Sequence, residues 1–180
     1  MEKKIFIAGF GGQGVVLAGK VLALAALKEN KNVLGMVSYG AEMRGGASNS
    51  SIIISDDEID CPIIDEADIV IALSQEAYDK FKLKVKKDGL LFVNSSDVNV
   101  DKEDIDAKVI EIPTTGIAKD MGNVKVANLL WVGVVLEKTK MIKVESAVSA
   151  LNEVFSGTKK DLLYINELAL KKGIELAARF

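Results

Sequence analysis

A buried strand, a glycine-rich turn and an apolar helix open the chain, and this succession limits the possible folds more than any other feature. Ile5-Phe6-Ile7-Ala8 is a short apolar run that ends at a glycine, which is typical of a buried strand. Residues 14–27 are apolar apart from Lys20 and form a segment long enough only for a helix. A buried strand that leads directly into a helix is the first unit of an α/β sheet.

Further apolar runs continue this pattern along the chain. They predict strands at 33–37, 49–55, 69–73, 90–93 and 108–112. The segment 80–87 alternates lysine with other residues, which favours a strand, whereas its position between two buried strands favours a helix. Both interpretations of this segment remain open.

The last third of the chain is predicted to be helical. Apolar residues between 144 and 155 recur at helical spacing, residues 158–161 resemble a capping box, and Gly173 is predicted to end the final helix. We therefore predict an α/β fold of three layers, with a mostly parallel sheet, helices on both of its faces and a helical C-terminal third. Because no linker or repeat is apparent, residues 1–180 are predicted to form one domain.

Composition excludes several kinds of site. The chain has no histidine, which removes the commonest general base and zinc ligand, and its single cysteine, Cys61, cannot hold an iron–sulfur cluster. The 23 basic and 26 acidic residues give a net charge of −3, which is not typical of a nucleic-acid-binding protein. The longest apolar run, 129–136, is too short to cross a bilayer. We therefore expect a cytoplasmic protein that binds neither nucleic acid nor membrane.

The glycine-rich turn fits the pattern G-x-G-x-x-G between a strand and a helix, and such a turn leaves helix N–H groups free for an anion. A dinucleotide site also requires an acidic residue at the end of the second strand, where this chain has Val37-Ser38-Tyr39. A Walker-type loop is disfavoured because Val21 follows Lys20, where serine or threonine should hold magnesium. A dinucleotide, another phosphate or carboxylate, and mere close packing of strand and helix all remain possible. The binding candidates in this turn are Gly11, Gly12, Gln13 and Gly14.

A second glycine-rich loop, 38–47, follows the second predicted strand. Loops at the carboxyl ends of strands meet at the ligand crevice of open α/β sheets, so we expect the two loops to lie together. Arg44 has a planar guanidinium suited to phosphate or carboxylate, although it can instead pair with Glu42 in its own loop. The binding candidates in this loop are Ser38, Tyr39, Arg44, Gly45 and Gly46.

Two further features suggest contacts beyond the sheet. Asn128 lies in an apolar segment, and its buried amide requires partners, either in a neighbouring backbone or in a cofactor or subunit contact. The helix 14–27 is apolar nearly all round, which is more than one sheet face requires, so we expect its second face to pack on a partner.

Taken together, the two glycine-rich loops resemble the gamma subunit of the 2-oxoacid:ferredoxin oxidoreductases. The resemblance covers essentially the whole chain and is strongest to the gamma subunit of 2-oxoglutarate synthase, although the pyruvate, branched-chain and indolepyruvate enzymes share the motifs. The segments that carry it are 9–15, 38–46, 67–75, 113–115 and 127–130, with Gly133.

The resemblance implies a role in a larger complex. Enzymes of this family decarboxylate a 2-oxoacid on thiamine diphosphate, transfer electrons through iron–sulfur clusters to ferredoxin, and pass the acyl group to coenzyme A. This chain lacks a cysteine set and a thiamine-diphosphate signature, so these cofactors are expected on partner alpha, beta and ferredoxin-like subunits. The isolated chain is therefore expected to be inactive. Within the complex, the chain is expected to act in assembly and in binding coenzyme A. The alternatives are a stand-alone dinucleotide-binding oxidoreductase and a scaffold without a ligand.

Overall fold

The computed structural model describes residues 1–39, 47–101, 103–157 and 160–179. Within these residues, six strands form one sheet in the order β2-β3-β1-β4-β5-β6. Strands β1, β4, β5 and β6 are parallel, whereas β3 is antiparallel to both β1 and β2, so the prediction of a mostly parallel sheet is confirmed. The bounds are Glu2–Phe10 for β1, Asn32–Tyr39 for β2, Ala47–Ser55 for β3, Ala67–Ala72 for β4, Val85–Asn94 for β5 and Lys108–Ile112 for β6.

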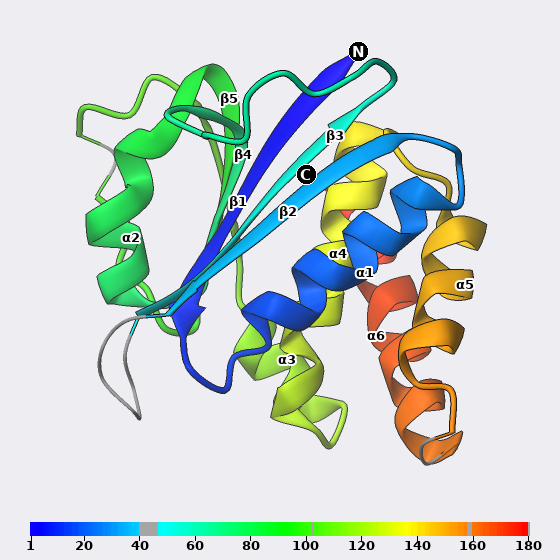
Figure 1. The fold of residues 1–180 in the computed structure, drawn as a ribbon. Helices are drawn as coiled ribbons and strands as arrows, with labels where there is room; N and C mark the ends of the chain where they lie inside the picture. Colours follow the sequence, from blue (N-terminus) through cyan, green and yellow to red (C-terminus); the bar gives the residue numbers. More distant parts are fainter. Residues whose placement is uncertain (40–46, 102, 158–159, 180) are drawn as a thin grey trace.

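Helices cover both faces of the sheet, which confirms the three-layer prediction (Figure 1). Helix α2 lies on one face, and α1, α4, α5 and α6 lie on the other, so the last third of the chain is helical as predicted. The α-helices are α1 (Val15–Leu27), α2 (Gln75–Phe81), α3 (Thr114–Asp120), α4 (Ala127–Thr139), α5 (Val144–Val154) and α6 (Lys160–Ala177). Two 3-10 helices are η1 (Lys82–Lys84) and η2 (Val124–Val126).

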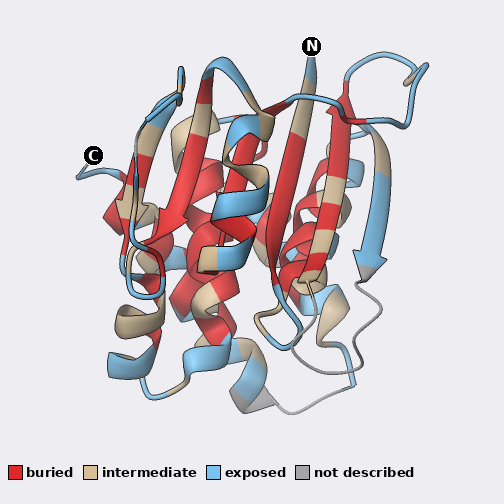
Figure 2. Ribbon diagram, turned by 90° about the vertical axis from the view of Figure 1, so that its left-hand side faces the viewer, coloured by how far each residue is buried: buried red, intermediate tan, exposed pale blue. Residues whose placement is uncertain are grey.

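The alternation of side chains along β1 builds the two halves of the core. Ile5 and Ile7 belong to the cluster under the large helical layer, whereas Phe6 and Ala8 belong to the cluster under α2. Figure 2 shows that the central strands are buried over most of their length. A strand buried on both faces lacks polar alternation, which explains why β1 and β4 appear in the sequence as continuous apolar runs.

Helix α1 contacts the sheet on one side and α5 on the other. Helix α5 covers part of the second face of α1, which the sequence analysis assigned to a partner. Leu17 and Ala23 are only partly buried and Leu27 is 52% exposed, so packing of this face on a partner stays a prediction.

Helix α6 continues past Gly173 to Ala177, so the predicted helix end at this glycine is wrong. The glycine instead allows α6 to approach α4, because an added Cβ would fall on the carbonyl of Leu130. Gly133 on α4 faces the carbonyl of Leu170 in the same way. The predicted capping box before α6 lies partly outside the described residues, since it includes residues 158–159.

The lysine-rich segment 80–87 divides among three elements. It ends α2, forms η1 and begins β5, so each of the two open interpretations holds for part of it.

The lysine at the start of β5, Lys86, forms an ion pair with Asp68, which is the second residue of β4. Asp68 also accepts hydrogen bonds from the Lys4 amide at 2.8 Å and the Lys3 Nζ at 3.3 Å. Burial opposes ionisation of Asp68, but these hydrogen bonds and charges outweigh it and hold its pKa below the usual range.

Candidate functional site

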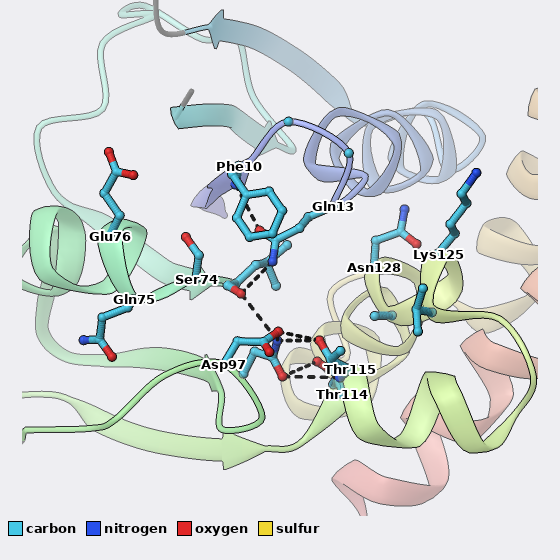
Figure 3. Close-up of a pocket in the computed structure, with 16 residues that line it drawn as sticks. Phe10, Gln13, Ser74, Gln75, Glu76, Asp97, Thr114, Thr115, Lys125 and Asn128 are labelled. Carbon is cyan, nitrogen blue, oxygen red and sulfur yellow. Dashed lines mark hydrogen bonds between the residues drawn. The ribbon is translucent and has the colours of Figure 1, made fainter. Parts of the chain in front are cut away.

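A cleft of about 690 Å³ lies at the carboxyl ends of the parallel strands, where the loops of an open α/β sheet bind ligands (Figure 3). Each of β1, β4, β5 and β6 contributes the residues that follow it, and η2 with the start of α4 forms the remaining wall. The lining residues are Phe10, Gly11, Gly12, Gln13, Leu73, Ser74, Gln75, Glu76, Asn94, Asp97, Thr114, Thr115, Val124, Lys125, Ala127 and Asn128.

Gln13 fixes the turn between β1 and α1. Its Oε1 accepts a hydrogen bond from the Phe10 amide at 3.0 Å, and its Nε2 donates to the Leu73 carbonyl at 2.9 Å. The side chain therefore ties the glycine-rich turn to the end of β4. The amide N–H groups of Gly11 and Gly12 donate to no residue that the structure describes, so they are available to a ligand.

Asn128, buried at 1% exposure, ties α4 to the same turn. Its Nδ2 donates to the Gly14 carbonyl at 3.1 Å, and its Oδ1 accepts from the Leu129 amide at 3.0 Å. Gly14 has φ of 74°, and an added Cβ would collide with the Asn128 amide, so this position requires glycine on both counts. The structural interpretation of Asn128 thus holds, and the residue also lines the cleft.

Asn94 organises the floor of the cleft from a buried position with 2% exposure. Its Oδ1 accepts from the Thr114 Oγ1 at 3.0 Å and the Thr115 amide at 3.3 Å. Its Nδ2 lies 2.7 Å from Asp97 Oδ2, 2.9 Å from Thr115 Oγ1 and 3.4 Å from the Leu73 carbonyl. Thr115 Oγ1 in turn donates to Asp97 Oδ2 at 2.6 Å. The ends of β4, β5 and β6 are therefore held together by one side chain.

The sequence analysis did not identify Asn94 or Asp97 as site residues. An asparagine and an aspartate after a strand are typical of an ordinary turn, and nothing in their spacing distinguishes such a turn from a binding site. Thr114 and Thr115 were named only within the resemblance. Lys125 was also missed, because a single lysine has no distinguishing pattern.

Charges in the cleft are few and separated. Glu76 and Lys125 lie on opposite sides of it, and Asp97 lies on the floor beside Thr115 (Figure 3). Among the described residues, Lys125 has no acidic partner, and Asp97 Oδ1 accepts no hydrogen bond. Apolar surface is contributed by Phe10 and Val124, which are 42% and 51% exposed.

The second glycine-rich loop is only partly described. Ser38 and Tyr39 end β2, which β3 separates from β1, and Ser38 is not among the residues that line the cleft. Arg44, Gly45 and Gly46 lie outside the described residues. The chain re-enters the sheet at Ala47, which pairs with Phe10 at the start of the glycine-rich turn. The structure thus brings Gly11, Gly12, Gln13 and Asn128 together in the cleft, with Gly14 bonded to Asn128.

Other classes of site find little support in the described ranges. No helix there is long and apolar enough to cross a membrane. No group of three or more His, Cys, Asp or Glu residues in those ranges could hold a metal ion. Cys61 is free and exposed.

Known proteins resemble the chain over nearly its whole length. A 2-oxoglutarate synthase subunit, KorC, from Methanocaldococcus jannaschii is 41% identical, over 98% of this chain and 95% of that protein. The gamma subunit of a keto/oxoacid ferredoxin oxidoreductase from Geobacter sulfurreducens superposes with a TM-score of 0.81 at 32% identity, over 99% of both chains.

A third structure shares the fold within a longer chain. The 2-oxoglutarate:ferredoxin oxidoreductase from Magnetococcus marinus, whose structure contains 2-oxoglutarate, coenzyme A and succinyl-CoA, superposes with a TM-score of 0.90 at 24% identity. The match covers 99% of this chain and 31% of that one.

The family model described as pyruvate ferredoxin/flavodoxin oxidoreductase matches residues 4–176. The chain therefore belongs to the pyruvate ferredoxin/flavodoxin oxidoreductase family, in which it is a gamma subunit of a 2-oxoacid:ferredoxin oxidoreductase.

Proposed function

We propose that this chain is the gamma subunit of a cytoplasmic 2-oxoglutarate:ferredoxin oxidoreductase. The complex oxidatively decarboxylates 2-oxoglutarate, forms succinyl-CoA and reduces ferredoxin. The observation that carries the choice of substrate is the 41% identity with the Methanocaldococcus jannaschii 2-oxoglutarate synthase subunit along almost the entire length of both chains. The chain has one cysteine and no thiamine-diphosphate signature, so the iron–sulfur clusters and thiamine diphosphate belong to the partner alpha, beta and ferredoxin-like subunits. The isolated chain is then inactive.

Within the complex, the gamma subunit acts in assembly and contributes to binding coenzyme A. Three features of the cleft support this role: its size, the amide groups of Gly11 and Gly12, which donate to no described residue, and Lys125, which has no acidic partner among the described residues. Arg44, Gly45 and Gly46, with Ser38 and Tyr39, remain proposed contacts from the second loop. Gln13, Gly14 and Asn128 act by fixing the shape of the first loop.

Reconstitution with the partner subunits tests the substrate. The complex is assembled with and without this chain, and ferredoxin reduction is measured with 2-oxoglutarate, pyruvate and 2-oxoisovalerate. We expect kcat/KM to be highest with 2-oxoglutarate, and activity to require the gamma subunit. A higher kcat/KM with pyruvate or with the branched-chain substrate would transfer the proposal to that specificity within the family.

Calorimetry of the isolated chain tests the rival from another class. A stand-alone dinucleotide-binding oxidoreductase requires tight binding of NAD(H) by this chain alone. We expect no such binding. A micromolar dissociation constant for NAD(H) would contradict the proposal that this chain acts mainly as a subunit of a larger enzyme.

A further inference from the structure

Strand β2 forms an unprotected edge of the sheet. Among the described residues, no strand pairs with its outer side. The strand has eight residues, none of them charged and none proline, and all eight pair with β3 in unbroken register. The opposite edge, β6, has only five residues and carries Lys108 and Glu111, which is typical of an edge protected against pairing. A long, uncharged and unbroken edge is instead a template for another strand.

The second half of β2 is exposed although it is largely apolar, as the strand at the right of Figure 2 shows. Met36 and Val37 are 46% and 45% exposed. Gly35 is exposed as well, and an added Cβ there would meet no atom within 4 Å, so no contact within the described chain accounts for a glycine at this position. A glycine inside a strand weakens the strand and often marks a place where another backbone comes close.

A groove of about 260 Å³ lies between β2 and α1 at the same edge. The residues that line it are mostly apolar or small: Val16, Gly19, Lys20, Ala23, Gly35, Met36, Val37, Ser50 and Ile52. Lys20 is exposed, and its side chain is long enough to keep the ammonium group in water. Val16 and Ala23 share one side of α1 with Leu27, which is 52% exposed. The exposed apolar surface therefore continues from the strand to the helix above it.

The sequence of β2 is symmetric in chemical type about Gly35. In an antiparallel pair of strands, opposite residues have their side chains on the same face of the sheet. Two copies of β2 paired about Gly35 would therefore set apolar residues against apolar residues, and no two charges would face each other. The opposite residues would be Val33 and Val37, Leu34 and Met36, and Asn32 and Ser38. A strand of an unrelated chain does not require this symmetry, so the symmetry favours a second copy as the occupant.

We infer that two copies of this chain pair through β2, antiparallel about Gly35, and so share one continuous sheet. A two-fold axis perpendicular to the sheet keeps the same face of both copies on one side. Both α1 helices then lie beside the axis on that side, because α1 contacts β2 and β3. The outer side of α1 gains a neighbour by the same pairing. The inference concerns the assembly of the complex and depends neither on the 2-oxoacid nor on coenzyme A.

Sedimentation equilibrium of the full chain tests the pairing. We expect the wild-type chain to sediment at twice its mass of 19.3 kDa at micromolar concentration. Met36→Lys sets an ammonium group against Leu34 of the second copy, so it should raise the dissociation constant of the dimer by about tenfold or more. The matched control is Leu83→Lys, which places the same charge on a 63% exposed leucine of η1 and should leave the constant unchanged. Circular dichroism melts establish that both variants are folded.

Crosslinking tests the register. In a Cys61→Ser background, single cysteines replace Met36 or Ser38, which are both exposed and lie on the same face of β2. In a pairing about Gly35, the two copies of position 36 are diagonal neighbours about 7–8 Å apart, whereas the two copies of position 38 lie about 20 Å apart. A short bismaleimide should therefore link Met36→Cys chains and leave Ser38→Cys chains unlinked, both in the free protein and in the reconstituted complex.

A wild-type chain that stays monomeric, or a Met36→Lys chain that stays as dimeric as the wild type, overturns the inference. Crosslinking of Ser38→Cys in place of Met36→Cys would show a different register and would overturn the pairing about Gly35. If the free chain is monomeric and Met36→Lys prevents binding of the alpha and beta subunits, the edge pairs with a strand of a partner subunit, and the inference is again overturned. Ferredoxin reduction by the complex is measured separately, so the proposed function and this inference can fail independently.

Discussion

The close approach of α4 and α6 predicts that Gly173→Ala destabilises the protein. An added Cβ at this position would fall on the carbonyl of Leu130, so the neighbour is backbone and cannot rotate away. Alanine is intrinsically better than glycine inside a helix by about 1 kcal/mol, which opposes the steric effect. Forcing an extra carbon into a packed interface costs about 1–3 kcal/mol and more where the backbone must move.

We expect the steric effect to prevail, because the two helix backbones must separate along their whole contact to admit the methyl group. The net loss should be about 1–2 kcal/mol in the free energy of unfolding. For a chain of 180 residues this corresponds to a fall in Tm of about 2–8 °C. Circular dichroism melts and urea titration measure both quantities.

Gly116→Ala is the matched control. Gly116 lies in α3, and an added Cβ there meets only the Ser96 Oγ at an ordinary distance of 3.4 Å. The helix-propensity gain then acts almost alone, so this variant should be neutral or more stable by up to about 1 kcal/mol. A Gly173→Ala protein that melts at or above the wild-type temperature would refute the close approach and the continuation of α6 past this residue.

Three further changes test the turn, the ion pair and the second loop. Gln13→Ala leaves the Phe10 amide and the Leu73 carbonyl without their side-chain partner, so it should lower the free energy of unfolding, measured by urea titration, by about 1–2 kcal/mol. It should also raise the KM for coenzyme A in the complex, and an unchanged KM would show that the turn does not contact coenzyme A. Asp68→Asn should lower the free energy of unfolding by about 1–2 kcal/mol at pH 7. The difference from wild type should shrink as the pH falls below about 4. The reason is that a carboxyl group whose pKa is lowered by folding stabilises the folded state above its unfolded pKa, and this stabilisation is lost when the carboxyl is protonated. A difference that is constant from pH 7 to pH 3 would show that the charge of Asp68 is irrelevant. Arg44→Ala should raise the apparent KM for coenzyme A in the complex without loss of assembly, and an unchanged KM would remove Arg44 from the proposed site.

The sequence predicts most elements of the fold because each is encoded locally. A strand buried on both faces is a continuous apolar run, and β1 and β4 are both of this kind. Gly173 shows where local reasoning fails, since a glycine after two lysines is typical of a helix end. Its real role depends on Leu130, which is distant in the chain and adjacent only after α4 and α6 pack. No pattern within the helix itself records that contact.

In the site, too, the sequence predicts features encoded by neighbouring residues but not contacts between residues far apart in the chain. The glycine-rich turn is visible in the sequence, and a buried Asn128 was expected to need partners. Its partner, Gly14, is 114 positions away, so only the folded chain identifies it. The cleft floor depends on β5 and β6 pairing in parallel with Asn94 beside Ile112, which places the residues after both strands together. Propensity gives the strands but not this register, and therefore not the floor.

Strand order argues against a dinucleotide site at the G-x-G-x-x-G pattern. In the dinucleotide-binding order, the second strand lies beside the first, so its terminal acid reaches the ribose next to the pyrophosphate. Here β3 lies between β1 and β2, and at about 4.8 Å per strand the end of β2 is displaced to roughly 10 Å from β1. Even an acid in place of Ser38 would therefore start one strand too far from the turn. With β3 inserted between β1 and β2, the turn presents backbone N–H groups with no described acidic residue beside them to bind a ribose. This arrangement favours a phosphate group bound from one side, in a site that other parts of a complex would complete.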